Sequence, residues 1–159
     1  LITHPVPAFV LFNVTFSLWH IPPLYNLSVT NHLVHIFEHL LFMGTALVMW
    51  WPIASVMPEL PRLTYPLQMV YLFLLSIAQL IVFAPITFSR EPLYQWYVDA
   101  PHVFAISPVV DQQIGAIIMK MGGGAIFITL IIVAFFRWFN HEERKSTVEA
   151  PEHDYEYAD

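Results

Sequence analysis

The chain has 159 residues, of which 57% are hydrophobic and 16% aromatic, whereas only 11% carry a charge. About a quarter of the residues are charged in an average globular domain, and a soluble core this small cannot cover thirteen phenylalanines and five tryptophans. The absence of cysteine excludes a disulfide scaffold and a thiolate metal site. Six Lys and Arg residues exclude a basic nucleic-acid surface. The composition therefore predicts an integral membrane protein, with the lipid bilayer as its surroundings and no nucleic acid among its partners.

Long uncharged runs divide most of the chain. A helix needs about 20 mostly apolar residues to cross a hydrocarbon core of about 30 Å, and these runs are too long for the strands of a membrane barrel. We therefore expect an all-α fold, a polytopic transmembrane helical bundle. Its four expected spans lie near residues 5–21, 31–51, 66–88 and 112–139.

Proline and asparagine mark the expected ends of these spans. Pro22-Pro23 is expected to stop the first helix, and Trp51-Pro52 the second, because proline lacks the amide hydrogen and clashes with the preceding turn. Asn31 is expected to cap the second helix. Residues 89–111 contain three prolines and four aromatic residues, which predicts a folded cap on the membrane surface.

Residues 1–140 are expected to form the transmembrane domain, and 141–159 an acidic, disordered tail that holds seven of the twelve acidic residues. Positive residues favour the cytoplasmic side of a membrane. One side of the predicted bundle has a single positive residue, Arg90. The other side has four: Arg62, Arg137, Arg144 and Lys145. This bias predicts a cytoplasmic C-terminus and places the segments 22–30 and 89–111 on the outer side.

The second span begins with a stripe of polar side chains. At 100° per residue, His32, His35 and His39 fall within an arc of about 60°, and Met43 follows one turn deeper. Imidazoles one turn apart can share a metal ion, and a thioether is a soft ligand suited to Cu(I). Glu38 is placed to orient an imidazole. The alternative is a network of histidines hydrogen-bonded to a neighbouring helix, with no metal involved.

Two histidines outside this stripe are placed on the same side of the membrane. His20 ends the first span at the depth of His32, either as a member of the cluster or as an interfacial residue beside Trp19. His102 lies in the outer segment, within reach of the cluster.

The fourth span opens with Asp111-Gln112-Gln113. Asp111 is either a helix-capping carboxylate or one end of a polar face that continues through Gly115 to Met119. Lys120 lies about two turns inside the predicted span, where a charge is costly unless it is paired. Glu38 is the acid at comparable depth, so we expect a contact between Glu38 and Lys120. The alternative is that Lys120 extends to the membrane surface.

Several short motifs together carry a resemblance to a known family. The chain resembles the CtaG-type cytochrome c oxidase assembly factors, the all-membrane bacterial family, over about residues 4–139. The motifs are His4-Pro5, Leu18-Trp19-His20-Ile21-Pro22, His32-Leu33-Val34-His35, Trp50-Trp51-Pro52-Ile53, Pro58-Glu59-Leu60-Pro61-Arg62-Leu63 and the run from Asp111-Gln112-Gln113 to Met119-Lys120. Members usually have about seven spans, so these four match the C-terminal part.

The resemblance implies a factor of the bacterial cytoplasmic membrane that matures a haem–copper oxidase and supplies it with copper. Its partners would be the subunits of that oxidase. The polar residues that it carries over are His20, His32, His35, His39, Asp111, Gln112, Gln113, Met119 and Lys120. The sequence shows no candidate nucleophile–base pair, so it gives no indication of an enzyme. Two other hypotheses stay open: an accessory subunit that remains bound to the oxidase, and a protein that binds a b-type haem through histidines such as His20 and His39.

Overall fold

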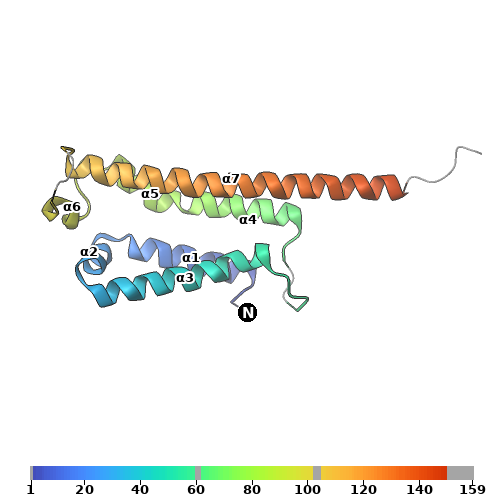
Figure 1. Cartoon of the computed structure of the whole chain (residues 1–159), viewed down its shortest axis with the longest axis horizontal. Helices are drawn as coiled ribbons and strands as arrows, with labels where there is room; N and C mark the ends of the chain where they lie inside the picture. The colour runs from blue at the N-terminus through green and yellow to red at the C-terminus, as the bar shows by residue number, and fades with distance from the viewer. Residues whose placement is uncertain (1, 60–61, 102–104, 150–159) are drawn as a thin grey trace, which may run out of the picture.

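The computed structural model describes residues 2–59, 62–101 and 105–149, and every regular element among them is a helix. Figure 1 shows two layers that run side by side. One layer holds α1, α2 and α3, and the other holds α4, α5 and α7, with α6 at the α2 end of the molecule. The helices are α1 (Pro5–Trp19), α2 (Pro22–Thr30), α3 (His32–Ala54), α4 (Tyr65–Ala78), α5 (Leu80–Phe88), α6 (Gln95–Asp99) and α7 (Pro108–Glu149).

The first layer contains a short helix that the sequence did not predict. Pro22 and Pro23 end α1 as expected, but they also occupy the first positions of α2, where the missing amide hydrogen costs nothing and the fixed φ angle suits a helix. Asn31 then caps α3 as predicted, because its side-chain oxygen accepts hydrogen bonds from the amides of Leu33 (3.0 Å) and Val34 (3.2 Å). α2 therefore folds back against the start of α3.

The expected end of α3 at Trp51-Pro52 is wrong by one turn. Pro52 lies inside the helix, which continues to Ala54. A proline in the last turn removes only one hydrogen bond. Its carbonyl oxygen accepts a 2.7 Å bond from the amide of Leu63, which ties the connection after α3 to the end of that helix.

The span expected at 66–88 is present but broken. α4 ends at Ala78 and α5 begins at Leu80, with Gln79 between them and Pro85 inside α5. Together they cover 24 residues from Tyr65 to Phe88, which is long and apolar enough to cross a membrane. Near this interruption the backbone carbonyl of Ser76 accepts a hydrogen bond from the side chain of Lys120.

α7 is longer than the predicted fourth span. Ser107 caps it: its hydroxyl oxygen accepts a bond from the amide of Val110 (3.4 Å), and Pro108 takes the first helical position. Asp111 lies in the first turn, so it is not the cap residue. The helix has 42 residues, about 63 Å at 1.5 Å per residue, which is about twice the hydrocarbon thickness. The segment 141–149, expected to be disordered, is helical. The rest of the expected tail lies outside the described residues.

Three of the four expected spans are long enough to cross a bilayer: α3, α4 with α5, and α7. The first, α1, is apolar but has 15 residues. Many large apolar side chains on all of these helices face outward, as the surface of a bundle in lipid does. The chain is thus a multi-pass membrane protein.

The two layers share a core of apolar side chains. Phe12 of α1, Met49 of α3, Leu72 and Leu75 of α4 and Phe127 of α7 pack together near the middle of the molecule. A second cluster joins α5, Tyr94 and α7 toward the α6 end. The polar residues singled out in the sequence lie around that end.

Candidate metal and polar site

The corner between α2 and α3 buries a polar contact. Ser28 of α2 is 2% exposed, and its hydroxyl donates a hydrogen bond to the Glu38 carboxylate of α3. The Ser28 hydroxyl is also 3.2 Å from Nδ1 of His35, and the Glu38 carboxylate is 3.7 Å from the same nitrogen. A serine and a carboxylate thus hold one side of the His35 ring. The expected role of Glu38 in orienting an imidazole stays a prediction, and the carboxylate lies near enough to His35 for it.

The other nitrogen of His35 faces a second histidine. Nε2 of His35 and Nε2 of His39 are 3.1 Å apart, and the two rings meet edge to face with their centres 4.5 Å apart. One turn of helix separates the residues, which is why the rings meet. Two nitrogen ligands of one tetrahedral metal ion, each about 2.0–2.1 Å from it, are about 3.3 Å apart. The separation is thus close to that of two ligands of one ion, although a ring would have to turn and the shared proton would have to leave before both nitrogens could bind it.

His32 and Met43 do not complete a ligand set in this conformation. His32 is exposed at the start of α3 and makes no hydrogen bond or ring contact with His35 or His39. Met43 lies on the same face of α3 and is exposed. Within the described ranges no group of three or more His, Cys, Asp or Glu side chains is close enough to hold a metal ion. The expected three-histidine cluster is thus a histidine pair.

His20 lies at the same end of the molecule as this pair and has partners of its own. Its Nδ1 is 2.6 Å from the carbonyl oxygen of Phe16, and its ring lies 4.2 Å from the Phe16 ring. The negative charge of Glu38 acts on His20 and on Tyr25. His20 also lines an apolar cavity of about 300 Å³ between the end of α1 and α5. His102 lies outside the described residues.

A tyrosine cluster closes the same end of the molecule. Tyr94 donates a 2.9 Å hydrogen bond to the carbonyl oxygen of His20, and its ring lies 4.2 Å from that of Tyr25. The hydroxyls of Tyr25 and Tyr97 are 3.5 Å apart. Burial raises the pKa of Tyr94 to about 12 and raises that of Tyr25 further. Both hydroxyls thus stay neutral over the physiological range. The predicted folded cap between residues 89 and 111 is confirmed for its described part.

The glutamines at the start of α7 hold this cap in place. Gln112 is 2% exposed; its side-chain oxygen accepts from the amide of Leu93 (2.8 Å), and its side-chain nitrogen donates to the carbonyl oxygen of Ile86 (3.4 Å). Gln113 donates to the carbonyl oxygen of Ser89 (2.9 Å). Asp111 and Met119 are exposed on α7. The cap also approaches Gly115, because the hydroxyl of Tyr97 lies 3.8 Å from the position of a Cβ there.

The expected contact between Glu38 and Lys120 is wrong. Lys120 lies on α7 and donates a 2.8 Å hydrogen bond to the carbonyl oxygen of Ser76, at the break between α4 and α5. Its ammonium is 3.5 Å from the Ser76 hydroxyl and 5.8 Å from the centre of the Phe83 ring. Glu38 is instead bound by Ser28 and His35. Each charge finds a partner in its own layer, because α7 packs against α4 and α5 whereas α3 packs against α1 and α2.

Sequence comparison assigns the chain to a family. The profile described as cytochrome c oxidase caa3 assembly factor (Caa3_CtaG) matches residues 1–141. The chain belongs to this family. The match covers α1 to α6, α7 as far as His141 and the whole polar site, so the resemblance drawn from the short motifs is confirmed.

Curated relatives are similar over the full chain but are much longer. Uncharacterized proteins of Mycobacterium bovis and Mycobacterium tuberculosis are each 26% identical over 159 residues. One of Mycobacterium leprae is 26% identical over 161 residues. In each case the alignment covers 99% of this chain and 24% of the relative. The chain thus spans about a quarter of the length of these relatives. No solved structure matches it.

Ser28, Ser76 and the three tyrosines are residues of the site that sequence reasoning missed. Ser28 lies in α2, which was expected to be a connection, although Pro22-Pro23 is also the signal of a helix start. Ser76 is an ordinary polar residue in an apolar run, and only the interruption of the helix gives its carbonyl a role. The aromatic content of residues 89–111 was the available signal for Tyr94 and Tyr97.

Proposed function

We propose that the chain acts in the assembly of a haem–copper cytochrome c oxidase and binds Cu(I) as cargo at His35 and His39. The observation that carries the proposal is the pair of facing Nε2 atoms 3.1 Å apart, with Nδ1 of His35 held by Ser28 and Glu38. Histidines that bind metals generally present their second nitrogen to such a partner. The family supports the oxidase as the destination.

In this proposal the chain is not an enzyme. The ion is received and released without a change in covalent bonds, so no nucleophile or base is needed. Met43, His20 and Met119 are candidates for further ligands after a side-chain or helix movement, because Met43 shares the α3 face and His20 ends α1 beside it. Thioether and imidazole ligands suit Cu(I). Partners are the oxidase subunits that receive the ion.

The proposal also includes an orientation. The chain lies in the bacterial cytoplasmic membrane with the α2, α3 and α6 end outward and the C-terminus of α7 in the cytoplasm. The distribution of Arg and Lys supports this, because Arg137, Arg144 and Lys145 all lie near the C-terminal end of α7.

The decisive experiment measures copper and iron per chain in gently solubilised protein. We expect about one copper per histidine pair in the parent protein. His35→Ala and His39→Ala should each lower copper retention at least tenfold and reduce oxidase activity in cells, because each removes one of two nitrogen ligands. Circular dichroism should show unchanged helix content.

His32→Ala is the matched control. It removes an imidazole from the same helix and the same exposed face, but it does not touch the pair. Equal copper loss in all three variants would overturn the site. Iron near one per chain would favour the haem hypothesis, although His39 would then have to turn away from His35 to share a haem with His20. Copper-free protein in stoichiometric complex with the mature oxidase would favour the accessory subunit.

A further inference from the structure

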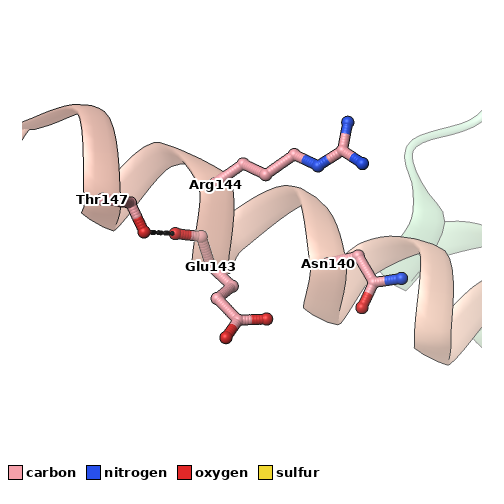
Figure 2. Close-up of a pocket in the computed structure, with 4 residues that line it drawn as sticks. All are labelled: Asn140, Glu143, Arg144 and Thr147. Carbon is pink, nitrogen blue, oxygen red and sulfur yellow. Dashed lines mark hydrogen bonds between the residues drawn. The ribbon is translucent and has the colours of Figure 1, made fainter.

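The end of the bundle opposite the histidine pair carries a second polar hollow. It lies between the start of α4 and the last turns of α7, has a volume of about 300 Å³, and is lined by Tyr65, Arg137, Asn140, His141 and Arg144. The four α7 residues follow the spacing i, i+3, i+4, i+7 and therefore share one helix face. A neighbouring hollow of about 560 Å³ shares Asn140 and Arg144 and is drawn in Figure 2.

Within the part of the chain that the structure describes, the two arginines of this hollow pair with no carboxylate. Among the described residues, the ion pairs on this part of α7 join Glu142 to His141 (3.8 Å) and to Lys145 (4.0 Å), and none includes Arg137 or Arg144. Figure 2 shows the Arg144 side chain directed back toward the turn of Asn140, whereas the Glu143 carboxylate points away from it. Lys145 thus has an acidic partner, whereas the described residues supply none to the arginines.

The start of α4 adds to the positive potential. Tyr65 is the first residue of α4, and the N-terminal end of a helix carries a partial positive charge. The guanidinium of Arg62 lies 5.6 Å from the centre of the Tyr65 ring, and its Nη2 is 3.5 Å from the Tyr65 hydroxyl. Two arginines, a histidine, a hydroxyl and an amide therefore line the hollow, and Arg62 lies beside its Tyr65.

The hollow lies beside a run of exposed aromatic residues on α7. Phe135, Phe136 and Phe139 are exposed, and Trp138 lies between them, which is the pattern of an aromatic belt at the lipid–water boundary. Arg137 begins within this belt and Arg144 lies about 10 Å further along the axis, at 1.5 Å per residue. A belt at this position would place Arg144 at the level of the lipid phosphate groups.

We propose that this hollow binds the phosphate headgroup of an anionic phospholipid. Arg137 and Arg144 would contact the phosphate, because guanidinium groups donate paired hydrogen bonds to it. Tyr65 and Asn140 would donate to the remaining oxygens. A bound lipid would join the start of α4 to the end of α7, at the end where the layer of α4 and α7 is otherwise open. The proposed lipid site shares no residue with the histidine pair, so the two proposals can be tested separately.

The test uses native mass spectrometry of the whole chain in detergent with added phosphatidylglycerol or phosphatidylcholine of the same acyl chains. The parent protein should retain phosphatidylglycerol in preference. Arg144→Gln and Arg137→Gln should each lower that retention about fivefold, the effect of about 1 kcal/mol per cation at a membrane surface. Retention of phosphatidylcholine should not change.

Lys145→Gln is the matched control, because it removes the same charge one residue away from Arg144 but from a lysine that Glu142 already pairs. An equal loss in Lys145→Gln would show attraction by diffuse charge and overturn the site. Equal retention of the two lipids would also overturn it. Displacement of phosphatidylglycerol by an equal concentration of inorganic phosphate would assign the hollow to a free anion instead.

Discussion

At the scale of single residues, two of the charges inside the predicted spans, Glu38 and Lys120, are stabilised in different ways. Glu38 contacts a serine and a histidine at a helix corner, whereas Lys120 donates a hydrogen bond to a backbone carbonyl and lies over an aromatic ring. Both would be costly if left without partners in lipid. The difference has a practical consequence: Glu38 belongs to the proposed metal site, and Lys120 belongs to the structure of the second layer.

Replacement of Lys120 by methionine tests this structural role. The change keeps the length of the side chain but leaves the Ser76 carbonyl without its donor at the break between α4 and α5. We expect a loss of about 1–3 kcal/mol in the free energy of unfolding, measured by titration of mixed micelles with a denaturing detergent. Lys145→Met, at an exposed position, should change it by less than about 0.5 kcal/mol. Copper retention should be the same in both variants.

At the scale of elements, the start of α3 decides the position of the histidine pair. Asn31 accepts hydrogen bonds from two amides of the first turn, and His35 and His39 lie on the turns that follow. The corner also requires α2, because Ser28 comes from that helix and reaches both Glu38 and His35. A frayed α3 start would separate these groups before it affected the rest of the bundle.

Asn31→Ala should therefore weaken the site and the helix together. Loss of a capping side chain costs about 1 kcal/mol. Amide hydrogen exchange should speed up about fivefold in the first turn of α3 and stay unchanged in α7. Asn31→Asp keeps an accepting oxygen at the helix start and should behave like the parent protein. Faster exchange throughout the chain in Asn31→Ala would contradict a local effect.

At the scale of the whole molecule, the two layers meet around a shared core and at the tyrosine cap. Tyr71 of α4 donates a 3.0 Å hydrogen bond to the carbonyl oxygen of Met49 in α3. At the other end Tyr25 belongs to the first layer, and Tyr94 and Tyr97 belong to the segment that Gln112 binds to α7. Movement between the layers would therefore change the surroundings of the histidine pair.

The cap should loosen at high pH. A tyrosine in an unfolded chain loses its proton near pH 10, whereas burial raises the pKa of Tyr94 to about 12. Between these values the folded state binds more protons than the unfolded state, so the free energy of unfolding falls as the pH rises above about 10. Below about pH 10 this contribution is fully present.

Tyrosinate absorbance near 295 nm checks this. In denatured protein all seven tyrosines should ionise together near pH 10. In native protein fewer than seven tyrosines should be ionised at about pH 11. Tyr94→Phe should remove one of the late groups from the titration. Ionisation of all seven near pH 10 in native protein would contradict the buried cap.

The local sequence predicts the helical spans, the helix cap and the histidine contact of this protein. Uncharged runs of about 20 residues predict spans because every backbone amide in lipid must be bonded within its own helix. The i, i+4 spacing of His35 and His39 predicts their contact because helix geometry is local. The Asn31 cap and the family motifs were likewise contained in short stretches of chain, and the structure and the family profile confirm both.

Contacts between segments distant in the chain were decided only by the tertiary structure. Depth along the membrane normal suggested that Glu38 and Lys120 meet, but depth says nothing about which helices are neighbours. The two residues lie in different layers, so each took a nearer partner. The hollow between Tyr65 and Arg144 and the Gln112 bonds to the cap arose in the same way. Helix formation depends on local backbone bonding, whereas the choice of neighbours depends on how whole helix surfaces fit together.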